Sequence, residues 1–125
     1  MALLDELLAR LRAEPVLSDV HVLESENVDD ATFHFKVRAV VKPANLQIRF
    51  LSDETFTRYS FQLYSDRSLL RWDNTPHYPG LSNFPHHFHD AEGNVLTSPL
   101  TGNLMSDVEI VLAEVRQFMA KYTEN

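Results

Sequence analysis

The chain has 125 residues, 44% of them hydrophobic, which is enough apolar material for one core but too little chain for two comfortable domains. The absence of cysteine excludes disulfides, cysteine-rich zinc sites and thiol nucleophiles. A net charge of −7 argues against a uniformly cationic nucleic-acid-binding protein. Because no apolar run could cross a bilayer and no leader-like segment opens the chain, we expect one cytoplasmic domain over residues 1–125 with no membrane association.

The first predicted element is an amphipathic helix over residues 2–13, which Pro15 ends. Its leucines recur at helical spacing and form one stripe, which is more typical of core packing than of a partner-binding face. The leucine stripe of this helix consists of Leu3, Leu4, Leu7, Leu8 and Leu11. After the helix, an irregular strand is predicted over residues 16–28.

Residues 32–72 are predicted to form an antiparallel meander. Apolar and polar residues alternate over 32–39, 45–50 and 57–64, and a turn at 65–66 returns the chain through Leu69 to Trp72. A period of two is typical of strands with one buried and one solvated face.

The middle of the chain is locally basic. From Lys36 to Arg71 there are seven Lys or Arg against three acidic residues, a local charge of +4. If the strands pair in sequence, these cations share one side of the sheet. A sheet face that is exposed to solvent is often charged without having a function. Here, however, positive residues outnumber negative ones, which favours a surface that binds an anionic ligand.

The C-terminal part is predicted to contain two short extended pieces around a turn at residues 90–94, then a loop over 98–103 and a helix. Ser106 and Glu109 have the spacing of a capping box, and an apolar stripe runs from Val108 to Tyr122. The predicted fold class is therefore α+β: an antiparallel meander sheet of roughly five to six strands, with the N- and C-terminal helices on one face and the cationic face open.

The segment Arg71–His89 differs in composition from an ordinary loop. It holds four of the six histidines, three of the six prolines and the only tryptophan. Proline restricts the backbone, so the loop is predicted to be stiff. In its last extended piece, alternation sends His87 and His89 to one side and His86 to the other.

The residue types in this segment are those needed for metal-free cleavage of an RNA phosphodiester. One histidine removes the proton of the 2′-hydroxyl, another protonates the leaving oxygen, and a cation stabilises the charge on phosphorus. The candidate catalytic residues are Arg71, Asp73, His77, His87 and His89. Other residues could bind the substrate by contacting phosphates or, where they are exposed, by stacking on bases. These candidate substrate-binding residues are Arg38, Arg49, Arg58, Tyr59, Tyr78 and His86. Trp72 is a further candidate for stacking.

Two other interpretations of the histidines remain open. His87 and His89 could bind a divalent metal with Asp73 or Asp90, although the H-x-H spacing is common and does not identify an ion. Alternatively, the histidines satisfy loop carbonyls and have a purely structural role.

The same segment resembles the TumE-type toxins of bacterial and archaeal toxin–antitoxin pairs. That family has the pattern Y-S-x-x-L, then R-[YW]-D-N-x-P-H-[HY]-P, then F-P-H-H-x-H. Here the corresponding stretches are YSFQL at 59–63, RWDNTPHYP at 71–79 and FPHHFH at 84–89. Tyr78 and Phe88 stand where the commoner members often carry histidine and a basic residue, which lowers the local positive charge.

The resemblance implies a growth-inhibiting toxin encoded beside a small DNA-binding helix-turn-helix antitoxin, which neutralises it by direct contact. Combined with the residue chemistry, it predicts a metal-independent ribonuclease that needs no cofactor and acts on RNA. The alternative is a non-enzymatic protein- or RNA-binding module that inhibits its target stoichiometrically. A homodimer is compatible with either function.

Overall fold

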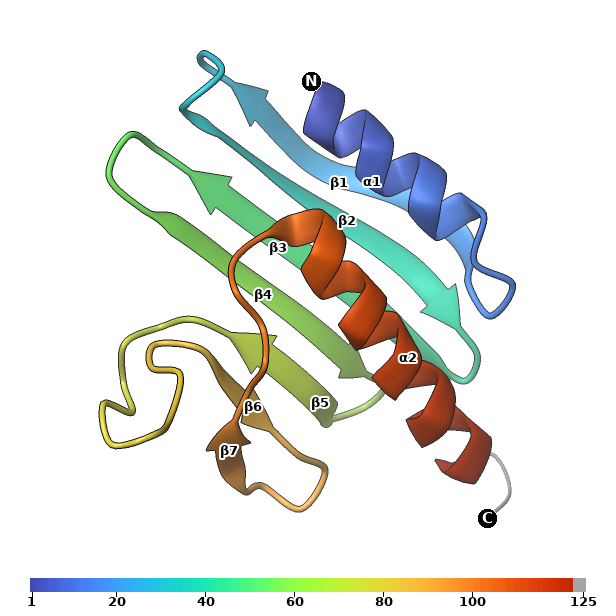
Figure 1. Cartoon of the computed structure of the whole chain (residues 1–125). Helices are drawn as coiled ribbons and strands as arrows, with labels where there is room; N and C mark the ends of the chain where they lie inside the picture. The colour runs from blue at the N-terminus through green and yellow to red at the C-terminus, as the bar shows by residue number, and fades with distance from the viewer. Residues whose placement is uncertain (123–125) are drawn as a thin grey trace.

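The computed structural model describes residues 1–122, which form two helices and seven strands (Figure 1). The N-terminal helix α1 and the long C-terminal helix α2 enclose the strands in sequence. The elements are α1 (Ala2–Arg12), β1 (Ser18–Asn27), β2 (Phe33–Val41), β3 (Ala44–Ser52), β4 (Thr57–Tyr64), β5 (Ser68–Asp73), β6 (His87–His89), β7 (Val95–Thr97) and α2 (Leu104–Tyr122).

The strands form one antiparallel sheet in which each strand pairs with the next, from β1 to β7. This confirms the predicted α+β meander, but the sheet has seven strands rather than five or six. The difference arises because β6 and β7 have three residues each, too few to show a period, and yet both join the ladder.

Both helices lie on the same face of the sheet, as predicted (Figure 1). The leucine stripe of α1 faces the core, and Leu4, Leu7 and Leu11 are buried. The apolar face of α2 meets the inward residues of the strands, where the rings of Phe35 and Phe50 stack with centroids 5.7 Å apart. Within the described residues, neither helix has an apolar stretch of the length that spans a membrane.

The start of α2 differs from the predicted capping box. The helix begins at Leu104, and the side chain of Asn103 accepts a hydrogen bond from the backbone N–H of Ser106 at 3.1 Å. Asn103 is therefore the N-cap, because asparagine caps a helix about as well as serine and lies one turn earlier. Glu109 instead accepts hydrogen bonds from Arg10 of α1 at 2.6 and 2.9 Å, which connects the two helices.

The face of the sheet opposite the helices is the polar face. Residues directly opposite each other in antiparallel strands point to the same side. Lys36 lies opposite Arg49, Arg38 opposite Gln47, and Gln62 opposite Arg71. The register confirms that the cations of the middle strands share this face: Lys36, Arg38, Arg49, Arg58 and Arg71.

Candidate functional site

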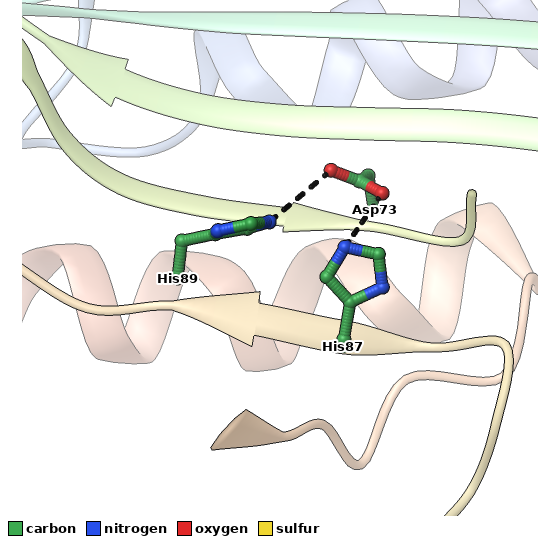
Figure 2. Close-up of side chains that lie close together, drawn as sticks. All are labelled: Asp73, His87 and His89. Carbon is green, nitrogen blue, oxygen red and sulfur yellow. Dashed lines mark ion pairs between the residues drawn. The ribbon is translucent and has the colours of Figure 1, made fainter. Parts of the chain in front are cut away.

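The pairing of β5 with β6 brings the candidate residues together on the polar face. Asp73 lies opposite His87, and Arg71 lies opposite His89. The Nε2 atom of His87 is 3.0 Å from Oδ1 of Asp73, and the Nε2 atom of His89 is 3.7 Å from Oδ2 (Figure 2). Asp73, His87 and His89 are called the Asp73 cluster below.

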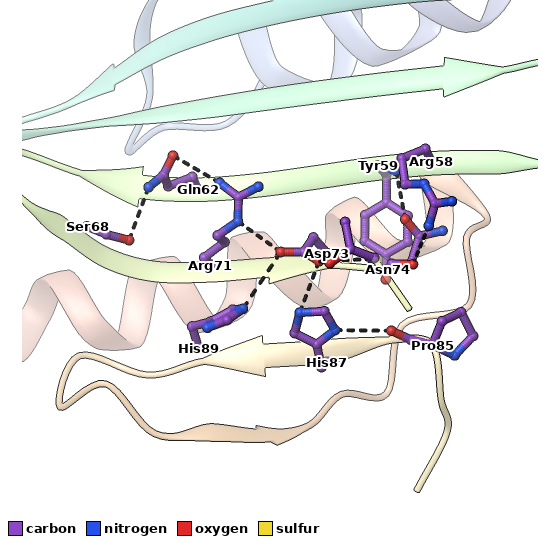
Figure 3. Close-up of polar contacts among 11 residues, drawn as sticks. Arg58, Tyr59, Gln62, Ser68, Arg71, Asp73, Asn74, Pro85, His87 and His89 are labelled. Carbon is purple, nitrogen blue, oxygen red and sulfur yellow. Dashed lines mark hydrogen bonds and ion pairs between the residues drawn. The ribbon is translucent and has the colours of Figure 1, made fainter. Parts of the chain in front are cut away.

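Asp73 is buried, with 4% of its surface exposed, and its carboxylate is fixed by several donors (Figure 3). Thr75 donates to Oδ1 from its backbone N–H at 3.0 Å and from its hydroxyl at 2.7 Å. Arg71 donates to Oδ2 from Nε at 2.9 Å. Burial alone would raise the pKa of Asp73, but these hydrogen bonds outweigh it and the pKa is lowered, so the carboxylate is charged near neutral pH.

His87 is 1% exposed and its two ring nitrogens have different environments. Nδ1 lies 3.1 Å from the carbonyl oxygen of Pro85, which can only accept a hydrogen bond, so Nδ1 carries the hydrogen. Nε2 has no hydrogen-bond partner among the described residues. Asp73 Oδ1 lies within 3.0 Å of it, but not in line for a hydrogen bond.

His89 forms the accessible side of the Asp73 cluster. Its side chain is 29% exposed, and burial of the rest lowers its pKa despite the opposing effect of Asp73. The ring of Tyr78 lies edge-on to both imidazoles, with centroids 4.8 Å from His87 and 6.1 Å from His89. Tyr78 therefore covers part of the cluster.

Arg71 is held at the border of the Asp73 cluster. Its Nε donates to Asp73, and Nη1 donates to Gln62 at 3.4 Å. Nη2 has no hydrogen-bond partner among residues 1–122, and 37% of the side chain is exposed. A guanidinium fixed on one edge and open on the other is suited to binding an anion.

The proline-rich loop is anchored by Asn74, which is 5% exposed. Its side chain extends the ladder of β4, accepting from the backbone N–H of Tyr59 at 3.0 Å and donating to the carbonyl of Thr57 at 2.7 Å. Arg58 donates to the Asn74 carbonyl at 2.7 Å. His77 is exposed on this loop, and its ring contacts that of Tyr78, with centroids 6.3 Å apart.

Three candidates for base stacking or substrate contact lie on the helix side of the sheet instead. Tyr59 is 2% exposed and Trp72 is 2% exposed, so neither ring can stack on a base. The Tyr59 hydroxyl lies 2.8 Å from Nδ1 of His86, and burial raises the pKa of Tyr59. His86 belongs to this buried contact rather than to the polar face, and burial lowers its pKa despite the charge of Asp107. The cause is strand alternation: Tyr59 shares its side with Phe61, and Trp72 pairs with Phe88.

The remaining predicted cations differ in availability. Arg49 is exposed on the polar face. Arg38 is half-buried and donates weakly to Gln47 at 3.4 Å. Arg58 is engaged by Asn74 and lies over the ring of Phe56, 5.4 Å from its centroid, so its first role is to hold the loop.

Of the two carboxylates considered for a metal site, only Asp73 lies with the histidines. The donor atoms of the Asp73 cluster are all within 4.8 Å of one another. Asp90 instead accepts from the backbone of Glu92 and Asn94 at 3.0 and 2.8 Å, in the predicted turn.

Sequence reasoning missed the residues that support the site. Thr75 fixes Asp73, Gln62 fixes Arg71, and Asn74 anchors the loop. The D-N-T sequence carried one usable signal, because an aspartate commonly accepts from the backbone two residues on and forms a local turn. Nothing comparable marked Gln62, whose contact depends on strand register.

Comparison with known proteins gives a single positive result. The family described as Toxin TumE matches residues 4–122, which is nearly the whole chain. No curated protein and no solved structure matches the chain. The family match extends well beyond the histidine segment and includes both helices.

Proposed function

Because the chain belongs to the TumE toxin family, we propose that it is the toxin of a toxin–antitoxin pair and that it inhibits growth by cleaving RNA at the Asp73 cluster. The observation that carries the proposal is the convergence of Asp73, His87 and His89 beside Arg71, on a sheet face that also bears the exposed Arg49. RNA is an anionic polymer, and phosphate contacts dominate its binding.

The polar face supports an RNA substrate by its charge distribution. Lys36 and Arg49 lie opposite each other on β2 and β3, in a row of paired residues that starts at Glu24 of β1 and continues through Ser60 to Asp73 and His87. Lys36 is paired with Glu24 at 3.2 Å, whereas Arg49 is exposed. A phosphate backbone crossing the strands would therefore meet Arg49 and then Arg71 on its way to the cluster.

The proposed reaction is displacement at phosphorus by the neighbouring 2′-oxygen. The bond from the 2′-oxygen to phosphorus forms and the bond to the 5′-oxygen breaks, leaving a cyclic phosphate and a free 5′-hydroxyl. The 2′-hydroxyl gives its proton to His89, the accessible imidazole of the Asp73 cluster, and His77, the exposed imidazole of the loop, protonates the leaving oxygen. Arg71 stabilises the charge on the phosphate oxygens through its open edge. His87 is too deeply buried for direct contact with RNA, so we assign it a positioning role.

The test is an assay of the purified protein on end-labelled RNA, beside growth arrest in cells. Arg71→Ala and His77→Ala should each reduce cleavage by about 10²-fold or more, as expected for loss of a charge-stabilising or proton-transfer group. Arg67→Ala and His21→Ala are the matched controls, because both side chains are exposed and lie outside the site. Wild-type growth arrest by a folded Arg71→Ala/His77→Ala double variant would refute the proposal.

A toxin of this kind requires an antitoxin that neutralises it. We expect the neighbouring reading frame to encode a small DNA-binding protein whose co-expression restores growth. If the wild-type protein arrests growth but cleaves no RNA under any condition, the stoichiometric binding module replaces the ribonuclease as the better explanation.

A further inference from the structure

We propose that the Asp73 cluster binds one divalent transition-metal ion of the zinc type, through Nε2 of His87, Nε2 of His89 and a carboxylate oxygen of Asp73. Binding of the ion does not depend on the proposed function, whereas its participation in RNA cleavage rests on it. If the ion takes part in cleavage, it would activate the 2′-hydroxyl in place of the free His89 imidazole, as an alternative to the metal-independent mechanism that the residue types favoured.

The spacing of the donor atoms fits a single ion. Two imidazole nitrogens lie 3.0 and 3.7 Å from the carboxylate oxygens of Asp73, and all donors are within 4.8 Å of one another (Figure 2). Ligands about 2.0–2.1 Å from a tetrahedral zinc ion are separated by roughly 3.3 Å from each other. The ring of His89 is partly exposed, and its Nε2 lies at the longer of the two distances from the carboxylate.

His87 supplies the strongest indication of a ligand. Its Nδ1 is satisfied by the Pro85 carbonyl, which leaves Nε2 to face the cluster. That atom is buried and has no hydrogen-bond partner among residues 1–122; its nearest polar contact is Oδ1 of Asp73 at 3.0 Å, which becomes an ion pair only when His87 is protonated. Burying a polar atom without a partner is unfavourable, and a cation bound to Nε2 and to the nearby carboxylate oxygen would give that nitrogen a partner.

The surroundings match those of metal ligands in other proteins. A metal-bound histidine commonly donates its second ring N–H to a backbone carbonyl, as His87 does. Ligating carboxylates are themselves held by hydrogen bonds, as Asp73 is held by Thr75 and Arg71. These contacts orient the donors before any ion arrives and so lower the cost of binding.

The donor set selects the class of ion. Two imidazoles and one carboxylate favour Zn²⁺, Co²⁺ or Ni²⁺ over Mg²⁺ and Ca²⁺, which prefer oxygen ligands. Three protein ligands leave a coordination position open, as in catalytic rather than structural zinc sites. With Arg71 alongside, the occupied site is net positive and suits a phosphate oxygen; the ion would supply Lewis-acid stabilisation and acidify a bound hydroxyl.

The test measures binding by the untagged, metal-stripped full chain in the absence of RNA. Titration with Zn²⁺ should show one equivalent bound in calorimetry, and Co²⁺ should give the visible absorption of a low-coordinate site with nitrogen ligands. Asp73→Asn and His89→Ala should each weaken Zn²⁺ binding by at least tenfold, whereas His21→Ala should leave it unchanged. His89 is partly exposed, so its variant remains informative if changes at His87 impair folding.

Absence of saturable Zn²⁺ and Co²⁺ binding by the wild type would overturn the proposal, as would unchanged affinity in both cluster variants. RNA cleavage provides a separate outcome. Binding of the ion without any cleavage would support the site and refute the ribonuclease. Cleavage that survives complete chelation would support the ribonuclease and refute the ion's role in it.

Discussion

His86 and His87 are adjacent in sequence but lie in opposite environments. His86 points to the helix side of the sheet, where its Nδ1 meets the Tyr59 hydroxyl at 2.8 Å and its ring lies near Gly102 at the start of α2. His87 points to the polar face, and its Nε2 has no hydrogen-bond partner among the described residues.

The difference separates a histidine held in a buried contact from the histidine on which the proposed metal site rests. A partly buried imidazole that finds a hydroxyl partner adds to the stability of the fold and leaves nothing to bind. A fully buried imidazole with one hydrogen-bonded nitrogen, and with the other facing a carboxylate at 3.0 Å, has the environment expected of the proposed metal ligand. Histidine content alone would have given the two residues equal weight, whereas the strand pleat assigns them different roles.

The largest expected effect is on the free energy of unfolding, and it comes from weakening the contact between β5 and β6. Trp72 is 2% exposed, and its ring lies 4.9 Å from that of Phe88, centroid to centroid, between β5 and β6. Trp72→Ala should lower the free energy of unfolding by about 3–5 kcal/mol, because it leaves a large cavity. Urea denaturation followed by circular dichroism would measure the change. A loss below about 1 kcal/mol would mean that this pair does not support the site.

The next effect should appear chiefly in the activity of the folded protein, with some loss of stability because Asp73 is buried and accepts hydrogen bonds from Thr75 and Arg71. Asp73→Asn keeps the size of the side chain but removes the charge that faces Arg71 and both histidines. RNA cleavage should fall by about 10²–10³-fold, while His86→Asn, on the other side of the strand, should leave the rate per folded molecule near the wild-type value. Equal losses in the two variants would remove the distinction between the faces.

Much of the fold could be predicted from the alternation of apolar and polar residues along the strands. The runs from Phe33 to Leu63 are long enough to show a period of two, and the same pattern already placed Tyr59 on the side of Phe61. The count of strands was not predictable in the same way, since β6 and β7 have three residues each. The start of α2 was also missed, because Asn103 and Ser106 are both good caps and the sequence alone does not choose between them.

The candidate site was predictable in composition but not in geometry. Alternation correctly sent His87 and His89 to one side of the last extended piece. Whether Asp73 or Asp90 joined them depended on the pairing of β5 with β6, a long-range register that local sequence does not specify. The contact of Gln62 with Arg71 has the same origin and left no local signal.

A smaller effect is expected from removing the partner of His86, and it should appear in the free energy of unfolding but not in activity. Tyr59→Phe removes the hydroxyl next to His86 Nδ1 and leaves that partly buried nitrogen without its partner. The free energy of unfolding should fall by about 1 kcal/mol, with RNA cleavage and Zn²⁺ binding unchanged. Denaturation curves and the two assays on the same preparation would measure all three. A loss of cleavage in this stable variant would place His86 in the site after all.

The smallest effect concerns an ion pair that lies outside both histidine environments. Hydrogen bonding from Arg10 lowers the pKa of Glu109, so this pair stabilises the fold above the unfolded-state pKa of about 4.3 and the contribution is lost as the pH falls through the lower folded value. Glu109 is 52% exposed, and solvent screening limits the contribution to under about 1 kcal/mol. Glu109→Gln should therefore be slightly less stable than the wild type at pH 7 and equal to it near pH 3, with RNA cleavage unaffected at neutral pH. An equal difference at both pH values would show that packing between α1 and α2, rather than charge, accounts for the effect.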